Sequence, residues 1–365
     1  MDNLVVVANQ FKPQGKVIAV EEYGNGNVND TFRVTLDSKE EKHFILQRIN
    51  TQVFRRPELI MLNMRTFSEH VRNRLKHAPI DVDRRWEVVR VLLAEDGQDH
   101  WIDDEGSFWR GISFIEGAQS FETIKDIRHA KEVGFALGMF HNLLSDLPSD
   151  RLADTLEGFH ITPSYLHYYD RVLAGNRPRK SHEVDYGLQF IKERRAWANV
   201  LEDARGQGRL SPRPIHGDPK VNNVMMDRAT GLAVSIVDLD TVKPGLVHYD
   251  IGDCLRSGCN PLGEETEDWE QVRFDLELCR AILQGYLSLT REFLTENDYE
   301  CLYDAVRLIA FELGLRFFTD YLEGNVYFKA NHQEHNLTRA LVQFKLTESI
   351  EAQKTAIRFI IGDMK

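Results

Sequence analysis

The residues best suited to chemistry lie in one stretch, His216 to Asn223, which reads H-G-D-P-K-V-N-N. An apolar segment ending in Asp238 follows it. Phosphoryl transfer needs a carboxylate that holds the acceptor hydroxyl and takes its proton, together with oxygen ligands for Mg²⁺. The spacing predicts Asp218 as the base and Asn223 and Asp238 as the metal ligands. Lys220 would offset charge on the moving phosphoryl group.

Ordinary loop chemistry is the alternative for this stretch. Asp-Pro and Asn-Asn pairs are common in turns, and a lone H-x-D occurs often by chance. The complete set is much more specific, because His, Asp, Lys and Asn are spaced in order and a β-branched strand then ends in an acid. We therefore favour the functional interpretation.

Composition limits the class of protein. The chain has 365 residues and a net charge of −12, with 42% hydrophobic residues. This length suits two lobes, and the acidic balance argues against nucleic acid as a partner. We expect a cytoplasmic protein, because the chain has neither an apolar run long enough for a membrane nor a signal peptide. The four cysteines form no C-x-x-C pair, which fits a reduced compartment, and His332 with His335 is interpreted as a surface pair rather than a zinc site.

The first third of the chain reads as strand-rich. Alternating apolar residues and turn signals predict a sheet of five strands. The expected strands cover residues 16–22, 29–36, 43–49, 86–94 and 107–115. One helix is expected over residues 57–76, where Pro57 suits a first helical turn.

A linker at residues 114–117 precedes a mostly helical region. Val133, Leu137, Phe140 and Leu144 recur at helical spacing. Further helices are expected over residues 191–205, 268–289, 298–322 and 337–361. A hairpin is expected from residues 223–226 and 233–238, which would bring Asn223 close to Asp238. The predicted division is an N-terminal nucleotide-binding lobe (1–113), a hinge (114–118) and a C-terminal helical lobe with the catalytic loop and acceptor site (119–365).

Two further features concern the site. The turn containing Gly24, Gly26 and Asn27 lies between the first two strands, where glycines let backbone N–H groups approach phosphates. A plain hairpin turn would look similar, but the position upstream of the H-x-D loop favours nucleotide binding. Asp250 is expected to cap a helix near Gly252 and to brace the catalytic loop.

The chain resembles the aminoglycoside phosphotransferase and choline kinase superfamily, and within it the N-acetylhexosamine 1-kinases. The matching segments are YGNGNVNDTF, FILQRIN, FHNLLS, HGDPKVNNVMMD, IVDLDT, YDIGD and LRFFTDYLEGNVYF. The resemblance implies a two-lobed, protein-kinase-like α+β fold, with a small N-terminal antiparallel sheet lobe and a larger helical C-terminal lobe. It also implies an ATP- and Mg²⁺-dependent kinase that phosphorylates the anomeric hydroxyl of a sugar. Ile115 and its neighbours would then bind adenine through the backbone.

One position departs from the pattern of protein kinases. Gln47 stands where a third-strand Lys would pair with the α- and β-phosphates. Arg48 is adjacent, but it should point to the other face of the strand.

The acceptor pocket is predicted around Arg316 and Tyr327, because sugar sites use multidentate donors and aromatic faces. A surface ion-pair ladder of Glu312, Arg316 and Asp320 is the alternative. Asp240, which should share a strand face with Asp238, is a candidate for contact with the metal or the sugar. Kinases of choline, amino alcohols or aminoglycosides, and an inactive nucleotide-binding module, remain as rival functions. The oligomeric state stays open.

Overall fold

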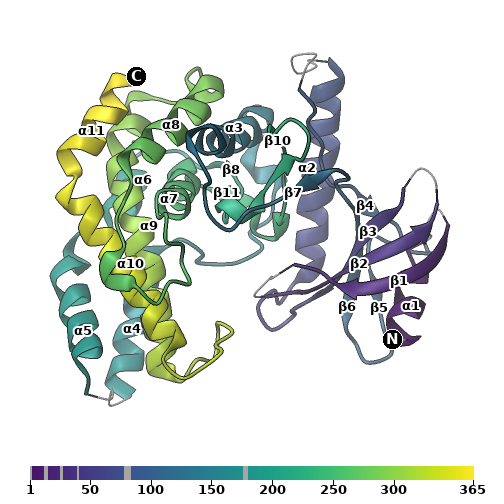
Figure 1. Ribbon diagram of the computed structural model, residues 1–365, viewed down its shortest axis with the longest axis horizontal. Coiled ribbons are helices and arrows are strands. Elements are labelled where there is room, and N and C mark those ends of the chain that lie inside the picture. The colour runs from purple at the N-terminus through teal and green to yellow at the C-terminus, as the bar shows by residue number, and fades with distance from the viewer. Residues whose placement is uncertain (1, 12–14, 25–27, 39–40, 78–83, 176–179) are drawn as a thin grey trace.

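The computed structural model describes residues 2–11, 15–24, 28–38, 41–77, 84–175 and 180–365. It contains two lobes, and the expected two-lobed α+β architecture is confirmed (Figure 1). The N-terminal lobe is a sheet with helices α1 and α2. The C-terminal lobe comprises the elements from β7 onward and is mainly helical.

The N-terminal lobe is built on a six-stranded antiparallel sheet with the order β1-β2-β3-β6-β4, in which β5 also pairs with β6. Alternation along β3 divides its side chains between two faces. Phe44 and Leu46 pack with Val7 and Phe11 of the α1 side. Gln47 points the opposite way, toward the cleft. The elements are α1 (Asp2–Asn9), β1 (Lys16–Glu22), β2 (Asp30–Asp37), β3 (His43–Ile49), α2 (Pro57–His77), β4 (Val91–Leu92), β5 (Trp101–Ile102) and β6 (Phe108–Ser113).

The C-terminal lobe packs its helices around one large apolar core, in which α9 is the longest helix. It also contains two small sheets, β10-β9-β7 and β11-β8. The stretch from His216 to Asn223 connects β8 of one sheet to β9 of the other. The elements are β7 (Ala118–Gln119), α3 (Ile127–Leu143), α4 (Thr162–Gly175), α5 (His182–Arg194), α6 (Val200–Gly206), β8 (Arg213–Ile215), β9 (Val224–Asp227), β10 (Ala233–Ile236), β11 (Lys243–Gly245), α7 (Val247–Gly258), α8 (Leu276–Thr290), α9 (Glu296–Glu323), α10 (His335–Ala352) and α11 (Lys354–Asp363).

Helix α2 joins the two lobes. Its apolar face packs in a second core that also contains Met225, Ile236 and Leu239 from the C-terminal lobe. Asn63, which is fully buried on α2, donates two hydrogen bonds of 2.8 Å to the carbonyls of Ala153 and Val242. These contacts attach α2 to the C-terminal lobe, and Figure 1 shows α2 between that lobe and the N-terminal sheet.

Several predicted boundaries are wrong. The strand expected over residues 86–94 shrinks to Val91–Leu92, since the backbone N–H of Glu87 donates instead to Val234 of the other lobe. The helix expected over residues 191–205 is interrupted by a 3₁₀ turn at Arg195–Trp197, and the last helix breaks at Gln353. Periodicity of apolar residues continues through such breaks, so it does not reveal them. The predicted stop at Gly324 is confirmed, because this residue caps α9 with a φ of 98°.

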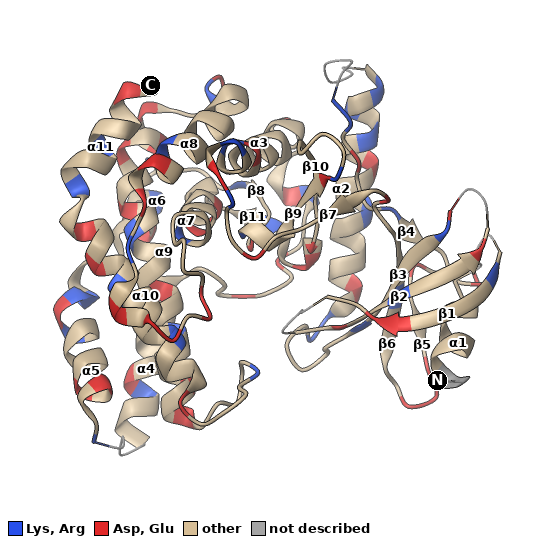
Figure 2. Ribbon diagram, in the orientation of Figure 1, with Lys and Arg blue, Asp and Glu red and all other residues tan. Residues whose placement is uncertain are grey.

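Charge is spread over both lobes. Figure 2 shows acidic and basic residues interspersed along the helices of the C-terminal lobe. Within the described ranges, none of the helices combines the length and the apolar character that crossing a membrane demands.

Candidate active site

Asp250 holds the backbone of the catalytic loop, residues 216–223, in place. It lies in the first turn of α7 rather than at its N-cap, so the predicted capping role is wrong. Its carboxylate accepts hydrogen bonds from the backbone N–H groups of His216 (2.7 Å) and Gly217 (2.8 Å), and from the His141 ring (2.9 Å). The predicted brace is therefore confirmed. Burial acts to raise the pKa of the Asp250 carboxyl, but the hydrogen bonds from His141 and from the backbone of His216 help to lower it below its usual value.

His216 ties the catalytic loop to the segment that carries Asp238. Its Nε2 donates to the Val237 carbonyl at 2.9 Å, and its Nδ1 accepts from the backbone N–H of Asp218 at 3.3 Å. This pair of bonds requires the neutral ring, and burial lowers the pKa of His216 in agreement. Gly217 has a φ of 87°, and a Cβ there would lie 2.7 Å from the Thr241 carbonyl oxygen, so the turn requires glycine.

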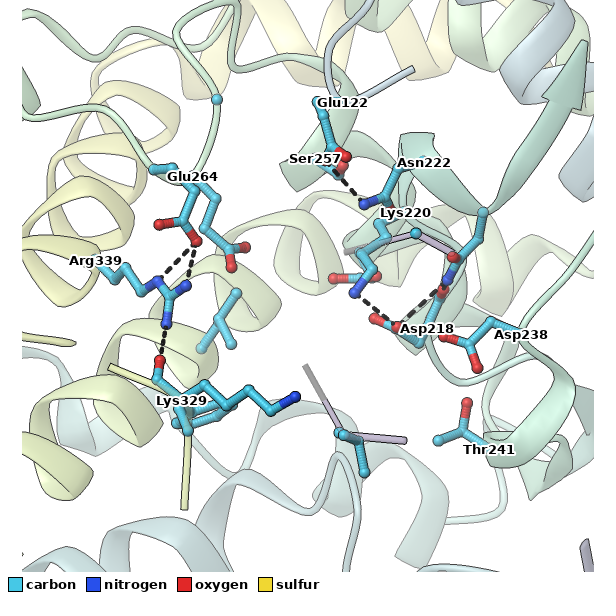
Figure 3. Close-up of a pocket in the computed structure, with 18 of the residues that line it drawn as sticks. Glu122, Asp218, Lys220, Asn222, Asp238, Thr241, Ser257, Glu264, Lys329 and Arg339 are labelled. Atoms are coloured by element: carbon cyan, nitrogen blue, oxygen red, sulfur yellow. Dashed lines mark hydrogen bonds and ion pairs between the residues drawn. The ribbon is translucent and has the colours of Figure 1, made fainter. Parts of the chain in front are cut away.

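The predicted catalytic residues meet in the cleft between the lobes (Figure 3). Lys220 Nζ lies 3.1 Å from the Asp218 carboxylate, and both side chains are partly exposed. Asn223 Nδ2 donates to the Asp218 carbonyl at 2.7 Å, which leaves its amide oxygen as the atom available to a cation. Asp238 lies beside them in a left-handed backbone conformation with a φ of 64°. Strained backbone of this kind is often found at functional sites.

The acids of the cleft fit a hard divalent cation. Asp238 opens to the cleft, yet partial removal from water and the charges of Asp240 and Asp218 raise its pKa to about 7. Lys220 only partly offsets this negative charge. One carboxylate and one amide oxygen are a donor set that Mg²⁺ accepts, with water completing its shell. Among the described residues, no group of three His, Cys, Asp or Glu side chains is placed to hold a metal ion by itself.

Both lobes line the part of the cleft where we predict the nucleotide. Gly24 has a φ of 77° and borders the cleft, as does the buried Ile115 that follows β6. Gly26 and Asn27 lie outside the described residues, so their predicted roles stay predictions. Apolar side chains that could enclose a base come from Val28, Ile45, Val89, Met225 and Val237.

Arg110 is a site residue that the sequence did not reveal. It lies opposite Gln47 in the pairing of β3 with β6. Its guanidinium donates to Gln47 Oε1 at 2.9 and 2.7 Å and lies 2.5 Å from Asp240. Strand β6 therefore supplies a buried cation to the cleft, whereas protein kinases supply a Lys from the third strand, which is β3 here. An Arg inside the apolar strand Phe108–Ser113 was the available signal. Arg48, as predicted, turns away and pairs with Asp30.

Asp240 faces the N-terminal lobe. Its second carboxylate oxygen accepts from Asn29 Nδ2 at 2.6 Å, in addition to the ion pair with Arg110. The expectation that Asp238 and Asp240 share a strand face is wrong, because β10 ends at Ile236 and Leu239–Thr241 form a 3₁₀ turn. Contact of Asp240 with an acceptor stays a prediction.

Arg316 points into a box of aromatic rings. Its guanidinium carbon lies 5.1 Å from the ring centroids of Phe159 and Tyr165 and 5.3 Å from that of Phe328. Within the described part of the chain no carboxylate forms an ion pair with it. The alternative of a surface ladder is wrong, since Glu312 and Asp320 are buried and bind other partners.

Asp320 arranges the loop that carries Tyr327. Its carboxylate accepts from the backbone N–H groups of Val326 (2.9 Å), Tyr327 (2.7 Å) and Phe328 (3.0 Å), and from the Asn336 side chain (2.9 Å). In the segment DYLEGNVYF, Asp320 therefore fixes the backbone on which Tyr327 is carried. Tyr327 borders the cleft beside the aromatic box.

His160 connects the helix of Arg316 to the catalytic loop. Its Nε2 donates to the Gly217 carbonyl at 2.6 Å, and its Nδ1 donates to Glu312 at 2.9 Å. Two donating nitrogens define an imidazolium, and the Glu312 carboxylate raises the pKa of His160 although burial opposes this. The residue has a φ of 65°, an uncommon conformation for a residue other than glycine. Nothing in the sequence near residue 160 indicated this link.

Solved structures of other proteins share this fold. The chain matches an aminopropanol kinase associated with a microcompartment at 15% identity (97% of this chain and 98% of that chain, TM-score 0.62). It matches an aminoglycoside phosphotransferase from Alicyclobacillus acidocaldarius at 14% identity (98% and 96%, TM-score 0.59) and a choline kinase from Cryptosporidium parvum at 14% (99% and 98%, TM-score 0.57). These similarities confirm the protein-kinase-like fold.

Residues 19–289 match the model of one family, described as the phosphotransferase enzyme family. The match covers most of the chain and contains the turn at Gly24, the catalytic loop and Asp238. The predicted superfamily is thereby confirmed. This chain belongs to the phosphotransferase enzyme family, whose members act as kinases of small molecules.

Proposed function

We propose that this protein transfers the γ-phosphoryl group of ATP to the anomeric hydroxyl of an N-acetylhexosamine. The observation that carries the proposal is the Arg316 guanidinium in its aromatic box, which lines the same cleft as Asp218 and forms an ion pair with no carboxylate of the described residues. Such a guanidinium can donate to two sugar oxygens at once, and the rings of Phe159 and Phe328 can pack against a sugar face. The resemblance of the segment LRFFTDYLEGNVYF to N-acetylhexosamine 1-kinases supports the same acceptor.

Each site residue has a role in this reaction. Asp218 would hold the acceptor hydroxyl and take its proton late in the transfer, while Lys220 would offset charge on the phosphoryl group. Asn223 and Asp238 would hold Mg²⁺, which neutralises phosphate charge. The Gly24 turn would cover the phosphates and Ile115 would border the adenine. In this proposal residues 1–113 form the nucleotide-binding lobe, residues 114–118 form the hinge, and residues 119–365 form the lobe that binds the acceptor.

A small amino alcohol is the second candidate acceptor. It is favoured by the net charge of −12 and by the similar structures described as kinases of aminopropanol and choline. Against it stands the charge of Arg316, because a cationic acceptor in the same box would meet a like charge. Phe159 and Phe328 could hold a cation only if Arg316 moved away.

Release of ADP across a panel of acceptors tests the proposal. The panel contains N-acetylglucosamine, N-acetylgalactosamine, glucose, choline, ethanolamine and an aminoglycoside. We expect turnover with the N-acetylhexosamines and a product that is acid-labile, as a sugar 1-phosphate is. Turnover confined to the amino alcohols would replace the proposal with its rival. Absence of turnover with every acceptor, while ATP still binds, would favour the inactive module.

A further inference from the structure

The peptide unit between Gly217 and Asp218 is held by a histidine at each end. Its carbonyl accepts a hydrogen bond from His160 Nε2 at 2.6 Å, and its N–H donates to His216 Nδ1 at 3.3 Å. Gly217 has a φ of 87°, and glycine has the widest backbone freedom of any residue. A peptide unit beside a glycine rotates easily unless it is restrained. The two histidines therefore act directly on the backbone that carries the Asp218 carboxylate.

The bond from His160 is the stronger of the two. It is 0.7 Å shorter than the bond to His216, and its donor is an imidazolium, which makes a charge-assisted hydrogen bond. Asp250 and Asn223 bind the peptide units on either side, at the N–H of Gly217 and at the carbonyl of Asp218. They therefore leave the restraint of the Gly217 carbonyl to His160.

The His160 ring is itself fixed in place. It is 4% exposed, and it stacks on Tyr249 with ring centroids 5.3 Å apart. Its Nδ1 donates to one oxygen of Glu312 at 2.9 Å, and the other oxygen accepts from Thr162 Oγ1 at 2.6 Å. A role in packing alone would be served by apolar side chains, because a buried ion pair gains little over them. The charged pair therefore indicates a requirement for a donor at the Gly217 carbonyl.

The same ring adjoins the aromatic box. The Phe159 ring packs against it with centroids 4.0 Å apart and lies 5.1 Å from the guanidinium carbon of Arg316. Glu312 precedes Arg316 by one turn of α9. His160 therefore lies where the predicted acceptor pocket meets the catalytic loop.

We propose that His160 is a positioning residue for phosphoryl transfer, which orients the Asp218 carboxylate through its bond to the Gly217 carbonyl. It acts without touching a substrate. The inference rests on the proposed role of Asp218 as the base, and it holds for whichever alcohol is the acceptor. Misplacing a catalytic group by about 1 Å can lower the rate roughly a hundredfold, so such a restraint has a measurable effect.

Steady-state kinetics of His160→Asn provide the first test. Asn is among the residues that best tolerate a positive φ, so the backbone is preserved while the ring is removed. The assay uses the acceptor of the panel above that the wild type phosphorylates fastest. We expect kcat to fall roughly tenfold to a hundredfold, with nearly unchanged KM values for ATP and for the acceptor. A raised acceptor KM with an unchanged kcat would place His160 in the acceptor pocket and overturn the inference.

A matched control separates positioning from a general loss of stability. Thr162→Val removes another buried hydrogen bond to Glu312 and leaves the bond to Gly217 in place. Turnover is expressed per ATP-binding site counted by calorimetry, so unfolded protein does not contribute. Thr162→Val should lower the melting temperature and keep kcat. A loss of kcat as large as that of His160→Asn would show that any damage to this cluster slows turnover, and would overturn the inference.

A double variant tests whether His160 acts through Asp218. Residues that work as one unit have strongly non-additive effects on turnover, whereas independent residues have effects that multiply. Adding His160→Asn to Asp218→Asn should therefore lower kcat little further, because the base that it orients is already absent. A further loss equal to that seen in the wild-type background would overturn the inference.

The remaining outcomes are also decisive. His160→Gly, which suits a φ of 65°, serves as a second variant, and failure of both variants to fold would assign His160 to folding and overturn the inference. If Asp218→Asn loses turnover and His160→Asn keeps it, only the inference fails. If Asp218→Asn keeps turnover, or the wild type phosphorylates none of the acceptors, the proposed function fails and the inference fails with it.

Discussion

The guanidinium of Arg110 lies 2.5 Å from the carboxylate of Asp240, and the two side chains come from different lobes. They are 2% and 3% exposed, so this ion pair is shielded from solvent on all sides. Asp240 lies two residues after the predicted metal ligand Asp238. This pair and the hydrogen bond from Asn29 therefore add to the contacts of α2 in holding the N-terminal sheet against the segment that carries Asp238 and Asp240.

Breaking this pair should destabilise the protein strongly. Arg110→Gln leaves Asp240 buried without its cation, and such losses cost about 3–5 kcal/mol. Arg48→Gln, which breaks an exposed pair with Asp30 on the other face of β3, should cost less than ~1 kcal/mol. Urea denaturation of both variants measures the difference. Equal costs would show that the pair between the lobes contributes no more than a surface pair.

Turnover should depend on Asp218. The Asp218→Asn variant keeps the shape of the side chain and removes the base, so kcat should fall by roughly two to four orders of magnitude. Binding of ATP, measured by calorimetry, should be preserved. A variant that retained more than about a tenth of wild-type turnover would exclude Asp218 as the base.

Binding of the metal should depend on Asp238. Asp238→Ala removes one of the two predicted ligands, and we expect loss of activity and loss of the Mg²⁺-dependent tightening of ATP binding. Titration of ATP with and without Mg²⁺ measures this. Asp227→Ala, at the turn end of β9 in the same hairpin, is the control and should keep the Mg²⁺ effect. An unchanged Mg²⁺ effect in Asp238→Ala would remove this residue from the metal site.

Binding of the acceptor should depend on the shape of the Arg316 side chain. Lys keeps the charge but loses the planar fork, so Arg316→Lys should raise the KM for the sugar roughly tenfold to a hundredfold. The KM for ATP should stay nearly constant. Steady-state kinetics with each substrate varied separately provides the measurement. A well-folded variant with an unchanged KM for the sugar would move the acceptor site elsewhere in the cleft.

The pair of His160 and Glu312 should make stability depend on pH. Because the pKa of His160 is raised in the folded protein, its contribution is complete below the unfolded value of about 6.5 and is lost as pH rises through the folded value. The groups that act on the ring are Glu312 and Asp253, while Tyr249 stacks against it. The difference in unfolding free energy between wild type and His160→Asn should therefore shrink above pH 6.5.

NMR titration of the histidine rings gives an independent measurement of this effect. The His160 signal should remain that of an imidazolium above pH 6.5 in the wild type. Glu312→Gln should lower the pKa of His160, because it removes the main charge that favours protonation. A neutral His160 ring at pH 6 in the wild type would contradict the assignment.

The sequence by itself determined the class of the protein and the core of its chemistry. Asp218, Lys220 and Asn223 lie within six residues of one another, and Asp238 follows in the same hairpin, so local geometry is sufficient to bring them together. The strands over residues 16–49, the helix from Pro57 and the stop at Gly324 were also predictable. Alternation, proline at a first turn and glycine at a helix end are local signals.

Only the tertiary structure decided which partners these residues meet. Arg110 and Asp240 are 130 positions apart in sequence, and His160 reaches Gly217 and Glu312 from a connecting segment. Hydrogen bonds and ion pairs between distant segments depend on how the helices and the sheet pack, and a pattern of residue types along the chain does not carry that information.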